Sequence, residues 1–100
     1  MNMQQMLIQA QKMKRELDKA LNELKAQEFS VNKGGAVTIK MLGDKTITAI
    51  EIDDDAFDKD NKDMVQELIV LGINELFKQI SDAEDAINER ITGQKGGLPF

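Results

Sequence analysis

Apolar residues recur at alternating spacings of three and four along the first quarter of this 100-residue chain, and this seam restricts the fold more than any other feature. A repeat of this kind is typical of a helix that buries one stripe against another helix. Between residues 2 and 27 there is no Gly or Pro, and Ile8 is the sole β-branched residue. The sequence therefore predicts one continuous helix over residues 2–27. The seam consists of Met3, Met6, Ala10, Met13, Leu17, Ala20 and Leu24, and Leu7 and Leu21 widen it.

Such a helix would be close to ~40 Å long at ~1.5 Å per residue, which is longer than a compact domain of this size is wide. We expect part of it to project from the domain or to pair with another chain. Because 100 residues hold only one substantial core, the chain is expected to form a single domain over residues 1–92.

The periodicity changes near Phe29 to the alternation typical of strands, and it continues with interruptions to Ile52. Gly34-Gly35 marks a first turn, and Gly43-Asp44 occupies the place of a tight hairpin turn. The pattern predicts a three-stranded antiparallel meander whose strands begin near Phe29, Val37 and Thr46.

The third strand breaks the simple alternation. In a regular strand, Ile47 and Ala49 would share one face, whereas Ile50 and Ile52 would share the other. Either a bulge shifts the register or both faces of the sheet are covered. We expect double coverage, with helices on one face and a partner subunit on the other.

An acidic connection over residues 53–61 follows the sheet. A calcium-binding loop is not expected here, because Phe57 or Lys62 falls at a position where such a loop needs a ligand. The aspartates are instead expected to be solvated and to cap the start of a helix. Phe57 is expected to tuck under the connection as an apolar anchor. The aspartates are Asp53, Asp54, Asp55, Asp58 and Asp60.

Helical spacing of apolar residues then predicts a second long helix from Lys62 or Asp63 to Ile91. Asp60 or Asn61 is expected to cap its start, and Gly93 to end it. The glycine-rich residues 93–100 are expected to form a flexible tail. The predicted fold class is α+β: a long N-terminal helix, a three-stranded antiparallel meander and a long C-terminal helix.

The chain lacks the usual side chains of catalytic and metal sites. It contains no Cys and no His, so disulfides, thiolate metal sites and histidine bases are excluded. Ser30 and Ser81 stand outside the G-x-S-x-G pattern, and the glycines form no phosphate-binding loop. Paired carboxylates such as Asp82 and Asp85 lack the concave pocket that acid–base catalysis needs. We expect no enzymatic activity, no cofactor and no bound metal.

No stretch approaches the ~20 apolar residues that span a bilayer, and the first residues lack the order of a signal peptide. We therefore expect a cytoplasmic protein with no membrane partner.

Charge is distributed unevenly along the chain, whose formal net charge is −5. Residues 1–50 hold eight Lys or Arg against five Asp or Glu, which gives +3, and residues 51–100 hold five against thirteen, which gives −8. A small acidic protein can still bind an anionic polymer where its cations gather in space.

Most of the basic residues of the first half lie on the first helix. Lys12, Arg15 and Lys19 have a spacing of three and four, so they are expected along one side of that helix next to the apolar seam. They would contact phosphates of duplex DNA, since a chain without Trp or Tyr is poorly suited to stack on single-stranded bases. Alternatively, the same cations form a solvated face and pair with Glu16, Asp18 and Glu23. The candidate DNA-binding residues are Lys12, Lys14, Arg15, Lys19, Lys25, Lys78 and Arg90, with Lys95 as a further contributor.

Several short patterns occur in a fixed order over essentially the whole chain. They are Gln9-Ala10-Gln11-Lys12-Met13, a glycine-led strand over 34–41, Gly43 at the hairpin, Ile50-Glu51-Ile52-Asp53, the segment 68–76 with Asn74, and Leu98-Pro99-Phe100. In order and spacing these patterns resemble the YbaB/EbfC family of bacterial nucleoid-associated proteins.

The resemblance implies a homodimer with tweezer-like projecting helices that binds double-stranded DNA with little sequence preference and helps to organise the nucleoid. The third strand would then supply the dimer contact, through Ile47, Ala49, Ile50 and Ile52. The alternative is a protein-interaction module in which the helical arms hold another helix or a DNA-processing complex and DNA contact is weak. Salt separates the two, because phosphate contacts weaken steeply with ionic strength and apolar contacts do not.

Overall fold

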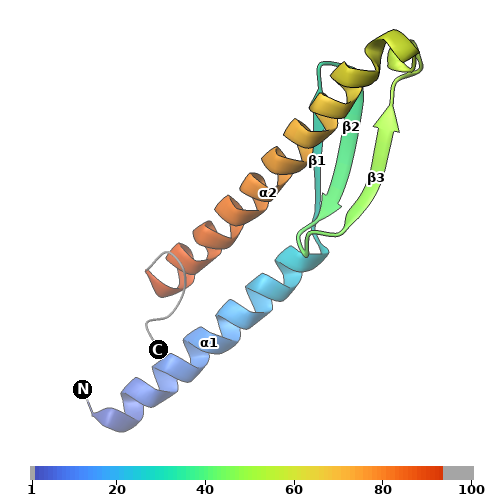
Figure 1. Ribbon diagram of the computed structural model, residues 1–100. Helices are drawn as coiled ribbons and strands as arrows, with labels where there is room; N and C mark the ends of the chain where they lie inside the picture. The colour runs from blue at the N-terminus through green and yellow to red at the C-terminus, as the bar shows by residue number, and fades with distance from the viewer. Residues whose placement is uncertain (1, 94–100) are drawn as a thin grey trace.

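The computed structural model describes residues 2–93, and it confirms the predicted order of a helix, a three-stranded antiparallel meander and a helix (Figure 1). The molecule is a rod of 69 × 18 × 16 Å with a radius of gyration of 19.1 Å, against about 13 Å for a compact domain of this length. The elements are α1 (Met3–Ala26), β1 (Glu28–Lys33), β2 (Val37–Leu42), β3 (Ile47–Ile52), the short 3₁₀ helices η1 (Asp54–Ala56) and η2 (Lys59–Asn61), and α2 (Lys62–Thr92).

Asn2 caps the start of α1, where its side-chain oxygen accepts a hydrogen bond of 2.8 Å from the Gln5 N–H. At the other end of α1, the turn between β2 and β3 docks on the last carbonyls of the helix. The Gly43 N–H donates to the Gln27 carbonyl at 2.9 Å, and a Cβ at Gly43 would lie 1.9 Å from the Leu24 carbonyl oxygen. Glycine is therefore required where the hairpin meets the helix.

The sheet has one apolar face and one polar face. On the apolar face, Val37, Ile39 and Met41 of β2 are completely buried. On the polar face, the Asn32 side-chain amide donates to the Thr38 hydroxyl at 2.9 Å. The Lys40 Nζ atom lies 3.9 Å from the Glu51 Oε1 atom on the same face.

The double coverage expected for β3 is wrong, because a bulge resolves its irregular pattern. Lys40 pairs with Ala49 but Met41 pairs with Ile47, which leaves Thr48 as an extra residue in the ladder. Cross-strand partners share a face, so the bulge brings Ile47 to the apolar face. There it joins Ile50 and Ile52, which oppose Ile39 and Val37, whereas Ala49 lies with Lys40 on the polar face.

The core lies between α2 and the apolar face of β1 and β2. Leu76 and Ile80 of α2 are completely buried there, and Gly72 lets the helix approach the sheet closely. A half-buried ion pair between Lys33 and Glu75 also joins β1 to α2. The core residues are Val31, Val37, Ile39, Met41, Ala56, Val65, Leu76 and Ile80.

In the acidic connection, the structure corrects one expectation. Phe57 does not anchor the connection: its side chain is 79% exposed, and the neighbouring Ala56 is the residue that packs into the core. Two aspartates instead order the backbone, since Asp53 accepts from the Asp55 N–H and Asp58 from the Asp60 N–H at 3.1 and 2.9 Å.

The ends of α2 agree with the sequence only in part. Asn61 precedes the helix but makes no capping hydrogen bond, and its amide donates to the Ala56 carbonyl at 3.4 Å. Gly93 ends the helix as predicted, in the left-handed conformation with φ 77°. The rest of the predicted flexible tail, residues 94–100, lies outside the described residues.

Candidate nucleic-acid interface

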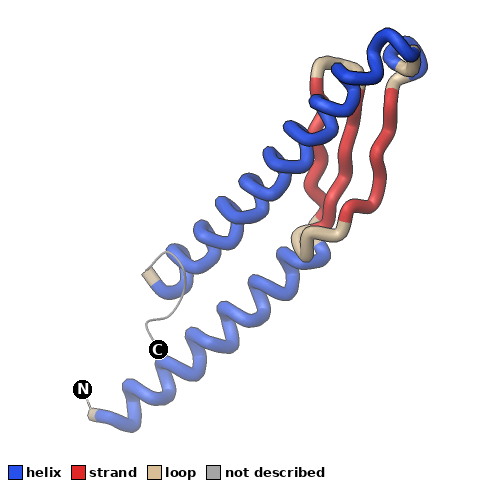
Figure 2. Tube along the Cα trace, in the orientation of Figure 1, coloured by secondary structure: helices blue, strands red, loops and turns tan. Residues whose placement is uncertain are grey.

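The first turns of α1 project beyond the rest of the molecule (Figure 2). The last turn of α2, with Arg90 and Ile91, lies beside residues 16–23 of α1, and these residues line a common hollow. The seam is buried where α2 covers it, at Leu17 and Leu24, and is open further out, where Met6 is 56% exposed. Residues 3–13 of α1 are called the arm below.

Lys12, Arg15 and Lys19 form a continuous line of cations, called the basic stripe below. All three side chains are exposed. At about 100° per residue, Arg15 and Lys19 each lie about 200° around the helix from the buried Leu17. On α1, Lys12 and Arg15 therefore lie on the side turned away from the seam, and not next to it as the sequence pattern suggested, whereas Lys19 also lines the hollow shared with Ala20 of the seam and Arg90.

The basic stripe is free to bind an anion. Within residues 2–93, no ion pair links Lys12, Arg15 or Lys19 to an acidic side chain. The acids that were the alternative partners, Glu16, Asp18 and Glu23, are all exposed on the same helix, and no ion pair within residues 2–93 joins them to the stripe. Exposed cations without an acidic partner in the described residues can contact phosphate without first breaking an ion pair.

Lys14 and Lys25 lie on a different side of α1 from the stripe. They are exposed, and eleven residues separate them, which places them on the same flank. Lys25 stands near Asp44 in the β2–β3 turn. Hydrogen bonds from the side chain and the backbone N–H of Thr46, together with the charge of Lys25, lower the pKa of Asp44.

The two candidates on α2 differ in their surroundings. Arg90 lines the hollow beside α1 together with Lys19, so the structure brings these two cations to one place. Lys78 is remote from them and pairs with Asp82 at 2.9 Å, one helical turn further along α2. The hydrogen bond to Asp82 and the charge of its carboxylate raise the pKa of Lys78.

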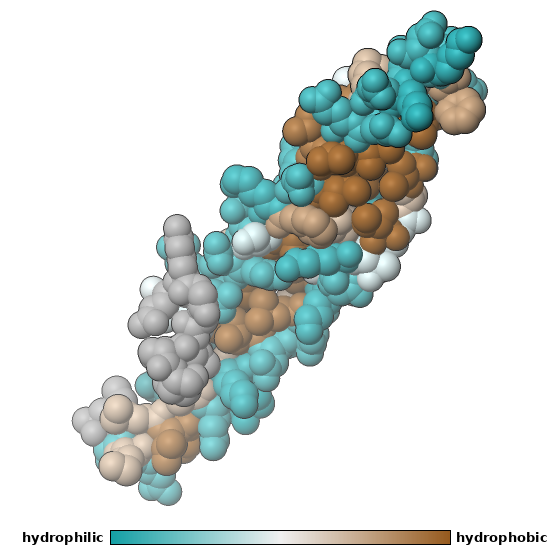
Figure 3. Space-filling model, viewed as in Figure 1, coloured by the Kyte–Doolittle hydropathy of each residue, from teal (hydrophilic) through white to brown (hydrophobic). Residues whose placement is uncertain are grey.

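A second surface, formed by β3 and one flank of α2, is apolar and uncovered. Because α2 packs over β1 and β2 and scarcely reaches β3, Ile47 and Ile50 of the apolar face remain 41% and 44% exposed. Figure 3 shows this area as a continuous brown patch beside α2. We call it the open apolar face, and its members are Ile47, Ile50, Ile52, Val70 and Phe77.

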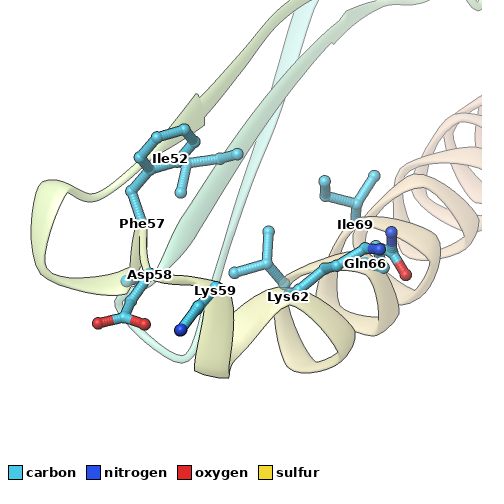
Figure 4. Close-up of a pocket in the computed structure, with 9 residues that line it drawn as sticks. Ile52, Phe57, Asp58, Lys59, Lys62, Gln66 and Ile69 are labelled. Carbon is cyan, nitrogen blue, oxygen red and sulfur yellow. The ribbon is translucent and has the colours of Figure 1, made fainter.

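A hollow of about 380 Å³ extends this face towards the tip of the molecule. Figure 4 shows Ile52 and Phe57 on one side of it and Ile69 and Gln66 of α2 on the other. Val70 follows Gln66 by four residues and Phe77 follows Val70 by seven, which places all three on the same flank of the helix.

The sequence pattern missed Val70 and Phe77 as part of a surface. Both fall outside the stripe of α2 residues that cover the core, and both are exposed. Their signal was present in the sequence, since two large apolar residues off the buried stripe widen it towards one side.

Two further findings concern the described part of the chain. Among residues 2–93, no group of three or more acidic side chains is placed to hold a metal ion. No helix there has the length and apolar character that crossing a bilayer requires.

The sequence of this chain is similar to a known protein family and to known bacterial proteins. A family model described as the YbaB/EbfC DNA-binding family matches residues 1–95. The chain belongs to this family. A nucleoid-associated protein of Ruminiclostridium cellulolyticum is 35% identical over 99 residues, which cover 98% of this chain and 86% of that protein. A nucleoid-associated protein of Mycoplasmopsis pulmonis is 34% identical over 100 residues, which cover 100% and 97% of the two chains.

A solved structure has the same fold as this YbaB/EbfC chain. The crystal structure of an uncharacterized protein from Helicobacter pylori superimposes with a TM-score of 0.69 at 19% identity, over 87% of this chain and 92% of that one. Asn74, one of the residues on which the resemblance to the family rests, is exposed on α2.

Proposed function

We propose that this member of the YbaB/EbfC DNA-binding family is a nucleoid protein that binds duplex DNA as a homodimer. The basic stripe makes the main contacts, to phosphates, and sequence preference is small. The role is one of binding, with no catalytic step. The observation that carries the proposal is the line of exposed, unpaired cations at Lys12, Arg15 and Lys19 on a projecting helix.

The separation of charge along the rod favours DNA contact at the basic stripe, far from the acidic connection. The acidic connection and the start of α2 lie at the opposite end of the molecule from the start of α1 (Figure 1). Duplex DNA is attracted to the stripe and repelled from the acidic end, so a negative net charge of −5 is compatible with binding. Arg90 beside Lys19, and Lys14 and Lys25 on another side of α1, add secondary contacts.

The open apolar face supports the homodimer. Monomeric soluble proteins rarely expose a large contiguous apolar patch, and such patches mark interaction sites. A second copy of the chain supplies the same face, and a twofold axis packs this face of one copy against the same face of the other. The interface then contains Ile47, Ile50 and Ile52 with the flank of α2, whereas Ala49 on the polar face lies outside it.

Dimerisation doubles the number of stripes in one particle. Six stripe cations per dimer correspond to a slope of about −5 in log K against log salt on B-DNA. Each contact is with the phosphate backbone, which carries no direct sequence information.

The test is a binding titration of the purified protein on a random duplex and on an A·T-rich duplex of equal length, over a series of salt concentrations. We expect a steep salt slope and affinities for the two duplexes within about tenfold. Absence of binding at low salt, or binding that ignores salt, would contradict the proposal and favour a protein-interaction module.

A further inference from the structure

The outer part of the seam, on the arm, is uncovered in the part of the chain that the structure describes. Met3 and Met6 are 78% and 56% exposed, and Leu7 beside them is also exposed. Further along α1, Leu17 and Leu24 of the same seam are buried, where α2 packs against this helix. The arm therefore continues a helix–helix interface beyond the end of α2, which lies beside residues 16–23.

The arm carries almost no charge, unlike the rest of the molecule. Of its eleven residues, six are apolar, four are glutamines and one, Lys12, is charged, whereas 31% of the whole chain is charged. Soluble surfaces usually carry about 25–35% charged side chains, which limit their self-association. An exposed helix surface with so many apolar residues and one charge is typical of a surface that another protein covers.

The chemistry of the arm fits a second copy of itself. Residues 2–13 contain no acidic side chain, so the seam offers nothing to a basic partner, and their single cation, Lys12, lies on the side turned away from the seam. An amide both donates and accepts hydrogen bonds, so Asn2 and Gln9 at the border of the seam can pair with the same amides of another copy. The alternating spacing of three and four is the pattern by which two like helices interlock. A second arm therefore matches the seam in shape, polarity and charge.

The position of α2 decides the direction in which two arms can pair. α1 and α2 lie side by side and run in opposite directions (Figure 1), and α2 covers the seam at Leu17 and Leu24. Two parallel arms would bring the α2 helices of both copies into the same space between the two α1 helices. In an antiparallel pair, each arm instead prolongs the line of α2 of the other copy, in the direction in which that helix runs. Met6 of one copy then lies opposite Ala10 of the other, and the two sheets lie at opposite ends of the pair.

We propose that the arms of two copies pair antiparallel through the seam, and that this contact joins two homodimers. The paired copies belong to different homodimers, because their open apolar faces lie at opposite ends of the pair and cannot meet. The arm spans less than two heptads, so the contact is weak in dilute solution and gains from the high local concentration of copies along one duplex. Lys12 and Arg15 stay accessible to DNA. The contact itself is independent of DNA, whereas the joining of two duplexes rests on the function proposed above.

Disulfide trapping without DNA tests the contact and its direction, because the protein has no cysteine of its own. Met6→Cys and Ala10→Cys proteins, distinguished by a tag, are mixed and mildly oxidised. We expect the disulfide between the two variants to exceed either homodisulfide on the order of tenfold, because like positions lie four residues, or ~6 Å, out of register. In the control, Gln4→Cys on the outer side of α1 replaces Met6→Cys and should give no such excess. A mixed disulfide no more abundant than in the control overturns the proposal.

Sedimentation of the concentrated protein without DNA tests the same contact by charge. Met3→Lys/Met6→Lys places like charges in the paired seam, and Gln4→Lys/Gln11→Lys adds the same charge on the outer side of α1. We expect the first variant to weaken association beyond the homodimer at least about tenfold, and the second to leave it unchanged. Equal association in the unmodified protein and both variants overturns the proposal.

Capture of a labelled duplex by a duplex fixed to beads tests the consequence for DNA. Both lysine variants add positive charge, so both should still bind duplex DNA. We expect M3K/M6K to capture at least about fivefold less labelled duplex than Q4K/Q11K, because only M3K/M6K loses the arm contact. Equal capture by the two variants contradicts the joining of duplexes. If the unmodified protein binds no duplex, the proposed function fails, and the two experiments without DNA still decide the arm contact.

Discussion

Gly72 of α2 lies directly over Ile39 of β2, and a Cβ at position 72 would come within 2.7 Å of the Ile39 Cδ1 atom. Val31 and Lys33 of β1 border the same site at 3.4 and 3.5 Å. This contact fixes how closely α2 approaches the sheet, and it centres the helix over β1 and β2. The uncovered state of β3 is therefore a consequence of where Gly72 seats the helix.

Gly72→Ala is expected to destabilise the protein. Overpacking a core costs about 1–3 kcal/mol, while the higher helix propensity of Ala returns about 1 kcal/mol. We expect a net loss of about 1 kcal/mol in the free energy of unfolding, measured by urea denaturation.

The matched variant is Ile39→Val, which removes the Cδ1 atom that the new methyl group meets. Alone it should cost about 0.5–1.5 kcal/mol. We expect the double variant to lose less free energy of unfolding than the two single variants lose together, by a coupling energy of about 1 kcal/mol. A more stable Gly72→Ala protein, or strict additivity, would show that the contact does not limit the packing.

If the proposed homodimer forms through the open apolar face, Ile50→Glu should disrupt it. Ile50 is 44% exposed in the single chain, so a glutamate there can reach water when the chain is alone but not when a second copy covers it. We expect dissociation of the dimer to increase by at least about 100-fold, as measured by analytical ultracentrifugation.

Ala49→Glu is the control for this experiment, because Ala49 lies on the polar face opposite Lys40. It should leave the dimer intact. If Ala49→Glu dissociates the dimer and Ile50→Glu does not, the two copies meet through the polar face instead.

The Asp44 turn predicts a pH-dependent contribution to stability. Its pKa is lowered by hydrogen bonds from the Thr46 side chain and backbone N–H and by the charge of Lys25. A depressed pKa in the folded state stabilises the fold above the unfolded-state value of about 4, and this contribution disappears as pH falls through the folded-state pKa.

The melting temperature of Asp44→Ala should therefore lie furthest below that of the unmodified protein near pH 7, and the difference should shrink as the pH falls below the unfolded-state pKa of about 4. Thr46→Val removes one of the two hydrogen-bond donors and should reduce the same pH-dependent difference. A gap that stays constant down to pH 2 would argue against a charged role for Asp44.

The long helices and the meander were predictable because their signals are repeated. The seam from Met3 to Leu24 has seven apolar members at regular spacing, and Gly93 supplies an unambiguous end to α2. Single residues decided what the pattern left open. Thr48 is one extra residue in β3, and its bulge moves Ile47 to the face of Ile50, which alternation alone does not distinguish from double coverage.

The position of a side chain relative to a neighbouring element was harder to predict. The spacing of Lys12, Arg15 and Lys19 gave their common side, but their separation from the seam follows from where Leu17 and Leu24 meet α2. Phe57 shows the same limit, because a lone apolar residue in an acidic connection has no periodic partners to indicate its direction.

The salt dependence of duplex binding is the most direct test of whether the basic stripe contacts phosphates. Lys12→Gln/Arg15→Gln/Lys19→Gln should be compared with Lys45→Gln/Lys59→Gln/Lys62→Gln, whose members are also exposed. Both triple variants change the formal net charge from −5 to −8, by removing three positive charges each. We expect the negative slope of log K against log salt to become shallower by about 5 in the first variant and to change little in the second. Equal slopes in the two variants would contradict the account, because DNA would then respond to net charge and not to the stripe.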